Sequence, residues 1–266
     1  MEISIGKLSE AFGLSDEALR FYEKKGLLHP ERKASGYRVF QRSDIQLVAN
    51  IRRLQNQNFS LEETRSVYSG TDEETLSAMY DDKIGEFRRS IAYQEHVLAH
   101  MEDSQRTLRS LPESLNVPCL CDGEPVYLLE YPSIPAMWDR IPQEPLLKEL
   151  LHHLPIVSFT SVIDKSAFDG SPAVLSKGIC LFERDLAVLD VDPAPMRRIE
   201  AKKAVTCLFR LEDGRFDTDQ IIKTMRAFMD ENHLHAADAA FTVFSASLVN
   251  RQGRAVHYAR LCVPVT

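Results

Sequence analysis

The stretch IGKLSEAFGLSDEALRFYEKKGLLHP, residues 5–30, decides the fold of the beginning of this chain. Residues 5–12 place their apolar side chains on one face, which is typical of a short helix. Gly13-Leu14-Ser15 predicts a tight turn, and Asp16 to Lys25 predicts a second helix. A charged loop and Gly36-Tyr37-Arg38-Val39-Phe40 follow, so the pattern indicates a winged helix-turn-helix. In such a motif the second helix enters the DNA major groove, and we expect the hairpin to contact the backbone.

Four blocks of residues in this region carry a resemblance to a known family. They are Ile5-Gly6-x-Leu8-Ser9, Leu19-Arg20-Phe21-Tyr22-Glu23, Gly26-Leu27-Leu28-x-Pro30 and Gly36-Tyr37-Arg38-x-Phe40. In this order and spacing they resemble the amino terminus of the MerR family of bacterial transcription regulators, over roughly residues 1–70. As a whole, the chain looks most like the multidrug-responsive, BmrR-type members of that family.

The resemblance also implies which side chains contact DNA. The matching positions are Arg20, Tyr22 and Arg38, with Tyr37 and Lys24 nearby. Arg20 can donate a bidentate pair of hydrogen bonds to a guanine edge or a phosphate. Tyr22 and Arg38 suit phosphate contacts that set the register on the duplex. Phe21 and Phe40 stand where the family often has Tyr, and we expect both in the core.

The charge is unevenly distributed along the chain. The net charge is −7. Residues 1–70 hold 11 Lys and Arg against 9 Asp and Glu, whereas residues 71–266 hold 21 against 30. Within residues 16–53 there are 9 basic and 5 acidic side chains. The basic excess therefore coincides with the helix-turn-helix pattern, as phosphate binding requires.

Residues 71–111 predict a long dimerising helix. The stretch contains no Pro, and its apolar side chains fall on a and d positions of one heptad frame: Ile84, Phe87, Ile91, Leu98, Met101 and Leu108, with Gln94 and Gln105 at two further seam positions. A small domain cannot bury so long a stripe, so the pattern favours a coiled coil. We expect a coiled coil of two antiparallel helices, as in the resembled family. The alternative is a helix that folds back on its own chain. A homodimer also suits a palindromic DNA site.

The pattern changes after a predicted linker at residues 112–123. In residues 124–266 we expect strands at 124–131, 156–163, 178–182, 187–191 and 205–211, helices at 143–154 and 220–232, and a hairpin of 241–249 with 255–263. The order strand–helix–strand–strand occurs twice, which indicates an α+β domain with a pseudo-two-fold axis. It resembles the GyrI-like ligand-binding domain, a duplicated βαββ fold. The expected fold is thus multidomain: an all-α winged helix-turn-helix head, a coiled-coil helix and this ligand domain.

The resemblance to GyrI-like domains implies a pocket for a small organic effector between the two halves. Aromatic candidates to line it are Tyr127, Trp138, Phe159, Phe182, Phe241, Phe244 and Tyr258. Core packing is the alternative role for each of them. Trp138, the single tryptophan, lies in Pro135-Ala-Met-Trp-Asp, where we expect a loop.

One departure from the drug-sensing relatives concerns charge. Those relatives bind cations through a buried Glu on the strand after the second helix, but the counterpart here, residues 239–249, contains no acid. Glu183 is then the best candidate for a carboxylate in the pocket, although an exposed strand-end charge is its alternative role. A neutral or anionic effector is therefore possible, and aromatic rings would still attract a delocalised cation.

The function expected from the resemblance is transcription activation. A dimer would bind promoter DNA and, when an aromatic, drug-like effector binds, distort the DNA so that RNA polymerase can use the promoter, at a cost of order 1–10 kcal/mol. Two alternatives remain: a thiol or metal sensor using Cys119 and Cys121, and a hydrolase using Glu183 with Tyr258. We predict no cofactor, no metal and no enzymatic activity.

The cellular setting follows from composition. We see no stretch that could span a bilayer and no signal peptide, and five Cys is an odd number that argues against a disulfide framework. A cytoplasmic protein is expected.

Overall fold

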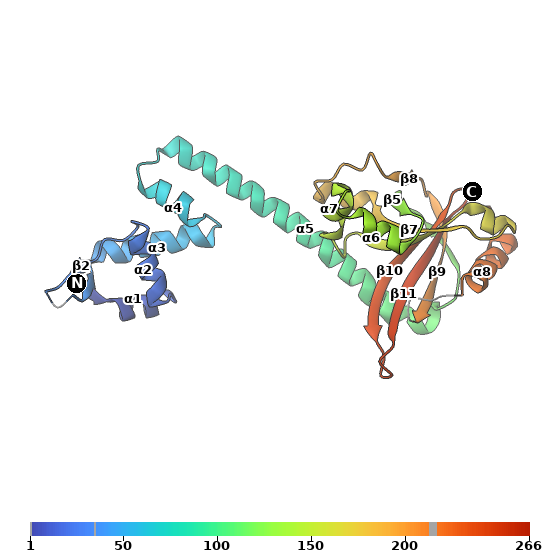
Figure 1. The fold of residues 1–266 in the computed structure, drawn as a ribbon, viewed down its shortest axis with the longest axis horizontal. Coiled ribbons are helices and arrows are strands. Elements are labelled where there is room, and N and C mark those ends of the chain that lie inside the picture. The colour runs from blue at the N-terminus through green and yellow to red at the C-terminus, as the bar shows by residue number, and fades with distance from the viewer. Residues whose placement is uncertain (1, 35, 213–216) are drawn as a thin grey trace. The chain divides into compact units, whose positions relative to one another are not determined.

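The computed structural model describes residues 2–34, 36–212 and 217–266, and the chain divides into two compact units, Met1–Ser90 and Ile91–Thr266. The first unit contains a small three-stranded sheet and the helices expected for the N-terminal motif (Figure 1). Its elements are β1 (Ile3–Ser4), α1 (Ile5–Phe12), α2 (Asp16–Lys24), β2 (Glu31–Arg32), β3 (Arg38–Phe40), α3 (Arg42–Asn56) and α4 (Leu61–Tyr68). The helix-turn-helix and its hairpin wing are therefore both present.

Local sequence explains where these helices begin and turn. The Ser4 and Ser15 hydroxyls accept hydrogen bonds from first-turn backbone N–H groups of α1 and α2. These N–H groups have no acceptor within their own helix, so the serines cap the two helices. Gly13 ends α1 in the left-handed conformation, at φ 60°, where a residue without Cβ is favoured. The turn between the two helices is thus encoded by Gly13 and Ser15.

A single apolar cluster holds the first unit together. It joins both helices of the motif to the wing and to α3, through Leu8, Leu19, Tyr22, Leu27, Leu28, Phe40, Val48 and Ile51. Phe40 is buried as predicted, because it closes the strand of the wing onto this cluster. Phe21 is 46% exposed, so its expected core position is wrong. Leu19 and Tyr22, three residues apart, form the buried face of α2, and Phe21 does not share that spacing, so its side chain points to a different side of the helix.

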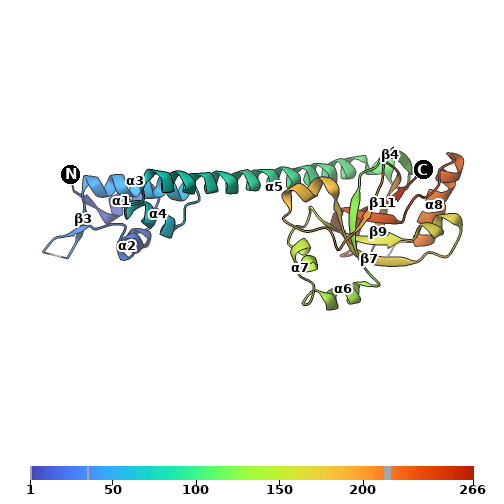
Figure 2. The ribbon, with the colours of Figure 1, turned by 90° about the horizontal axis from the view of Figure 1, so that it is seen from above.

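Helix α5 (Glu73–Ser114) is one unbroken ribbon (Figure 2). It continues past Pro112, where we expected it to end. Pro112 lacks an N–H donor, but the next turn still closes: Leu115 N–H donates to Leu111 O at 3.2 Å, and Ser114 Oγ donates to Ser110 O at 2.7 Å.

The two long faces of α5 differ in exposure. Within the second unit, Tyr93, His96, Val97, His100 and Thr107 are partly or fully buried, at the three- and four-residue spacing of one helix face. The predicted heptad seam lies on the other face. Its apolar members, Ile84, Phe87, Ile91, Leu98, Met101 and Leu108, are 39–61% exposed. A continuous apolar stripe is therefore uncovered in the single chain.

The second unit is built on an eight-stranded sheet with the order β4-β9-β11-β10-β6-β7-β5-β8. The strands are β4 (Cys119–Asp122), β5 (Val126–Tyr131), β6 (Ser158–Ile163), β7 (Leu175–Phe182), β8 (Arg197–Ile199), β9 (Lys203–Glu212), β10 (Ala240–Val249) and β11 (Ala255–Pro264). Two β-strand triplets, β5-β7-β6 and β9-β11-β10, meet where β6 pairs with β10. This symmetry matches the predicted duplication of strand–helix–strand–strand.

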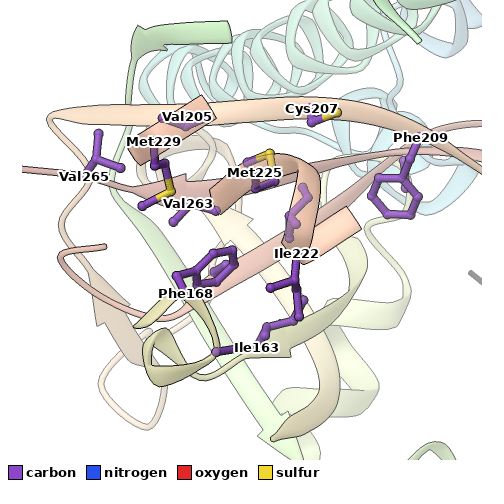
Figure 3. Packing of buried hydrophobic residues seen from close by; sticks show 14 of the residues in the cluster. Ile163, Phe168, Val205, Cys207, Phe209, Ile222, Met225, Met229, Val263 and Val265 are labelled. Atoms are coloured by element: carbon purple, nitrogen blue, oxygen red, sulfur yellow. The ribbon is translucent and has the colours of Figure 1, made fainter. Parts of the chain in front are cut away.

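Helices cover one face of this sheet. In the first half, α6 (Ile134–Arg140) and α7 (Pro145–Leu151) pack on β5 and β7 through Met137, Leu147, Leu150 and Ile179. In the second half, α8 (Thr218–Glu231) packs on β9 and β11 through Ile222, Met225 and Met229, which Figure 3 shows beside Phe168 of the 3₁₀ helix η1 (Lys165–Asp169). Each half thus has its own core on the same face.

Three local expectations are corrected by the structure. The predicted linker 112–123 contains β4, which pairs with β9 as an edge strand. Residues 187–191 were expected to form a strand, but none of them lies in one; the 3₁₀ helix η2 (Glu183–Val188) ends within this stretch. Trp138 lies on α6 rather than in a loop, because Ser133 caps a helix whose first turn accepts Pro135.

Among the described residues, no helix is long and apolar enough to cross a membrane.

Candidate functional site

The structure brings three of the five predicted DNA-contacting residues together in the first unit. Arg20 from α2 and Tyr37 and Arg38 from the wing line one surface hollow of about 440 Å³. Tyr37 is 76% exposed, so its ring and hydroxyl face solvent. Lys24 is exposed in the last turn of α2. A cationic and hydrogen-bonding surface on the second helix and the wing is suited to phosphate oxygens.

An acidic residue positions the wing against α2. Glu23 accepts a hydrogen bond from Arg38 Nε at 2.6 Å and from Arg32 at 2.9 Å. The hydrogen bond from Arg38 holds the pKa of Glu23 below its usual value. Arg38 therefore keeps a defined orientation, and its guanidinium has further N–H donors for an anion.

Tyr22 does not fit its predicted role. The side chain is 4% exposed within the core of the first unit, and its hydroxyl donates to Gln55 Oε1 of α3 at 2.7 Å. Because the hydroxyl is buried and already bonded, the expected phosphate contact by Tyr22 is corrected to a packing role. Phe21 is the exposed aromatic residue of α2 instead, with Lys25 Nζ 5.5 Å from its ring centroid.

The predicted effector-binding aromatics divide between two cavities in the second unit. Trp138, Phe159 and Phe244 line one cavity of about 400 Å³, which we call the Trp138 cavity. It lies on the helix-covered face and is also lined by Ser161, Lys177 and His257. Trp138 and Phe159 have ring centroids 6.4 Å apart. Such an apolar cavity with a few polar groups is typical of small-molecule sites.

Phe182, Phe241 and Phe244 line a second cavity of about 390 Å³. We call it the α5 cavity, because His100, Asp103 and Ser104 of α5 line it as well. The rings of Phe182 and Phe241 form an edge-to-face pair at 6.4 Å. Cys121 and Cys262 also lie along its walls.

The remaining candidates lie elsewhere. Glu183 Oε1 accepts a hydrogen bond from Arg198 Nη2 at 2.9 Å and another from the Tyr127 hydroxyl at 3.4 Å. Neither Glu183 nor Tyr127 is among the residues that line the two cavities, and the same holds for Tyr258. The predicted pairing of Glu183 with Tyr258 is replaced by the contact with Tyr127, and Arg198 engages the carboxylate.

Cys119 and Cys121 point to the same face of β4, as strand alternation requires. Their sulfurs lie 3.5 and 3.8 Å from Thr206 Oγ1. Among the described residues, no group of three or more His, Cys, Asp and Glu side chains gathers in a way that could hold a metal ion.

Sequence reasoning missed a polar cluster between α5 and η2. Asp185 is 1% exposed, and its two oxygens accept hydrogen bonds from His96 Nδ1 at 2.8 Å and His100 Nε2 at 3.1 Å. Burial acts to raise the pKa of Asp185, but the bonds from His100 and His96 outweigh it and lower that pKa. The spacing of His96 and His100 by four residues was the available signal, since it places both on one helix face.

Comparison with known proteins agrees with the N-terminal motif. The model of the MerR HTH family regulatory protein matches residues 3–71. HTH-type transcriptional regulator HmrR of Rhizobium leguminosarum bv. viciae is 32% identical over 111 residues, which cover 42% of this chain and 77% of that protein. The mercuric resistance operon regulatory protein of Bacillus cereus is 32% identical over 97 residues, covering 34% and 74%.

A solved structure of an EcmrR–DNA complex is similar over 99% of both chains, at 16% identity and a TM-score of 0.37. That score is too low to establish a shared fold. The sequence matches, together with the helix-turn-helix and wing of the first unit, decide the family. The chain belongs to the MerR family of helix-turn-helix, DNA-binding transcription regulators.

Proposed function

We propose that this chain is a dimeric, ligand-responsive regulator in which a small aromatic effector controls transcription from a promoter. The Trp138 cavity carries this proposal, because it combines about 400 Å³ of space with aromatic walls from α6, β6 and β10. The duplicated strand–helix–strand–strand sheet supports a GyrI-like, BmrR-type sensor domain. Residues 124–266 are then the effector domain, and residues 1–70 contact the DNA.

The proposed dimer forms along the exposed stripe of α5. Ile84, Phe87, Ile91, Leu98, Met101 and Leu108 are solvent-exposed in the single chain, and the polar Gln94 and Gln105 share their heptad frame. A second copy of the helix, antiparallel to the first, would bury this stripe in a coiled coil. Two helix-turn-helix motifs related by a two-fold axis then match a palindromic promoter element.

The proposed switch acts on promoter DNA together with RNA polymerase. Effector binding favours the state of the dimer that bends and untwists the promoter, so that RNA polymerase engages both of its elements. Distortion of this kind costs of order 1–10 kcal/mol. The effector must therefore bind the activating state more tightly than the resting state, because a ligand shifts an equilibrium only by its differential affinity.

The test is a thermal-shift screen of the full-length protein with Trp138 fluorescence alongside. The panel contains aromatic cations, neutral drugs, aromatic acids and thiophilic metal ions. We expect an organic compound to raise the melting temperature and to quench Trp138, the single tryptophan. Trp138→Phe should keep the fold and lose the fluorescence response. A shift with thiophilic ions alone, abolished in a Cys119→Ser, Cys121→Ser double variant, would contradict the proposal.

A further inference from the structure

The α5 cavity lies on the face of the sheet that α6, α7 and α8 leave free. Ala240 of β10 packs in the apolar cluster beneath α8, so the next residue, Phe241, projects from the other face, where it lines this cavity. Helix α5 contributes His100, Asp103 and Ser104 to the same walls. A ligand held in the α5 cavity would therefore contact the sheet and the long helix at the same time.

The carboxylates in the cavity walls are each paired with a cation. The pairs are Asp103 with Arg106, Asp122 with Lys203 and Glu124 with Arg184. Arg184 also lies over the ring of Phe182, with its guanidinium carbon 4.8 Å from the ring centroid. His100 is engaged by Asp185 at 3.1 Å. These acids have their own counter-charges, so they do not neutralise a further cation in the wall.

Arg260 supplies such a cation. It lies on β11 opposite Val243 of β10, and both residues line the cavity. Its Nη2 donates a hydrogen bond to Thr107 Oγ1 of α5 at 3.4 Å, and within the described part of the chain its side chain forms no ion pair. Cys262, two residues further on the same strand face, is a neutral thiol, because burial raises its pKa to about 12. The other N–H groups of the Arg260 guanidinium are thus available to an anion.

Aromatic rings form an apolar part of the same walls. Phe182 and Phe241 lie edge to face there, with centroids 6.4 Å apart, and the cavity of about 390 Å³ is large enough for a small ring system. A carboxylate can accept two parallel hydrogen bonds from one guanidinium. The walls therefore suit a molecule with a flat apolar body and one carboxylate.

We propose that the α5 cavity is a second small-molecule site, separate from the Trp138 cavity, and that it binds an aromatic carboxylate. The ring of the ligand packs on Phe182 and Phe241, and its carboxylate accepts hydrogen bonds from Arg260. Because Arg260 is also bonded to Thr107, the ligand strengthens the attachment of α5 to the sheet. This inference goes beyond the function proposed above, since it does not depend on what the Trp138 cavity binds.

The experiment compares two ligands that share one ring system. 2-Naphthoate carries the carboxylate, and 2-naphthamide is its neutral analogue. Both are titrated into the full-length protein, and isothermal titration calorimetry gives the dissociation constants. We expect 2-naphthoate to bind more tightly, by about ten- to a hundredfold, the range for a hydrogen bond to a charged group.

Two variants with matched controls assign the binding to this cavity. Arg260→Met should remove the preference for the carboxylate, whereas Arg251→Met, at an exposed arginine of the turn between β10 and β11, should keep it. Val243→Phe fills the cavity and should raise both dissociation constants at least tenfold. Val249→Phe makes the same change at a position of β10 that is 69% exposed and should leave them unchanged.

Two further measurements keep the test decisive. Circular dichroism melting establishes that each variant folds; if Arg260→Met does not, Val243→Phe and the two ligands still decide the question. Trp138→Phe alters the other cavity and should leave the binding of 2-naphthoate unchanged.

The outcomes separate this inference from the proposed function. If binding of 2-naphthoate is lost in Trp138→Phe but persists in Val243→Phe, the ligand occupies the Trp138 cavity. That result overturns this inference and leaves the proposed function intact. Equal affinity for the two ligands, or no saturable heat with 2-naphthoate, also overturns it. Loss of binding in Val243→Phe alone supports it, whatever the effector screen finds.

Discussion

Asp185 accepts a hydrogen bond from His96 Nδ1 at 2.8 Å, which joins η2, directly after β7, to the long helix α5. His100 occupies the second carboxylate oxygen at 3.1 Å. Asp185 is buried, so both oxygens depend on these histidines for partners that water would otherwise supply. The cluster therefore fastens this part of α5 to the sheet of the second unit.

Replacing Asp185 should destabilise the second unit. Asp185→Asn keeps the shape of the side chain but removes the charge and one acceptor, so His96 or His100 loses a good partner. We expect the free energy of unfolding to fall by about 1.5–3 kcal/mol, the range for hydrogen bonds to a charged group. Urea unfolding followed by circular dichroism measures the change. Asp190→Asn, at an exposed position nearby, is the control and should leave stability nearly unchanged.

The same carboxylate predicts a pH dependence. The pKa of Asp185 is lower in the folded state than its ordinary value of 3.8, so the unfolded chain binds the proton more readily. Its stabilising contribution is then complete above about pH 5 and is lost as the pH falls below about 4 through the folded pKa. The gap in unfolding free energy between wild type and Asp185→Asn should shrink as the pH falls from 5 towards 3, where Asp185 takes up its proton. A gap that widens between pH 5 and pH 3 would contradict this assignment.

Arg38 should contribute one phosphate contact. Its guanidinium lies in the hollow with Arg20 and Tyr37 and is oriented by Glu23. Arg38→Ala should weaken binding to all DNA sequences and reduce the slope of log affinity against log salt by about 1. Fluorescence anisotropy over a salt series measures this slope. Arg251→Ala, in the turn between β10 and β11, is the control; an unchanged slope for Arg38→Ala would remove Arg38 from the interface.

The exposed stripe of α5 predicts a dimer that one charge can weaken. Leu98 is 54% exposed on the a/d seam, and the neighbouring Ala99 is exposed outside it. Leu98→Glu would place two carboxylates in the proposed coiled-coil seam, and we expect the dimer dissociation constant to rise at least tenfold, as judged by sedimentation equilibrium. Ala99→Glu should have little effect. Equal behaviour of the two variants would argue against this seam.

The thiols of β4 should be dispensable for the organic response. Cys119 and Cys121 contact Thr206, and Cys121 lines the α5 cavity rather than the Trp138 cavity. A Cys119→Ser, Cys121→Ser double variant should therefore keep the Trp138 quenching produced by an aromatic effector. Loss of quenching in a variant whose circular dichroism melt is unchanged would revive the thiol or metal sensor alternative.

Local and periodic features were predictable from sequence. Gly13 and Ser15 mark the turn between α1 and α2, and the heptad frame of α5 marks the stripe that is exposed in the single chain. Short helices were harder to predict. Trp138 lies in a seven-residue helix, α6, which is too short for its periodicity to stand out beside Pro135.

The sequence by itself determined the helix-turn-helix motif, the long helix and the duplicated strand–helix–strand–strand pattern, because these depend on neighbours a few residues apart. Only the tertiary structure decided which side chains share a site. Strand register places Lys177 beside Ser161 and packing buries Tyr22 against Gln55, while α5 brings His96 to Asp185, 89 residues later. Contacts between distant residues depend on the packing of whole elements, which a local pattern does not contain.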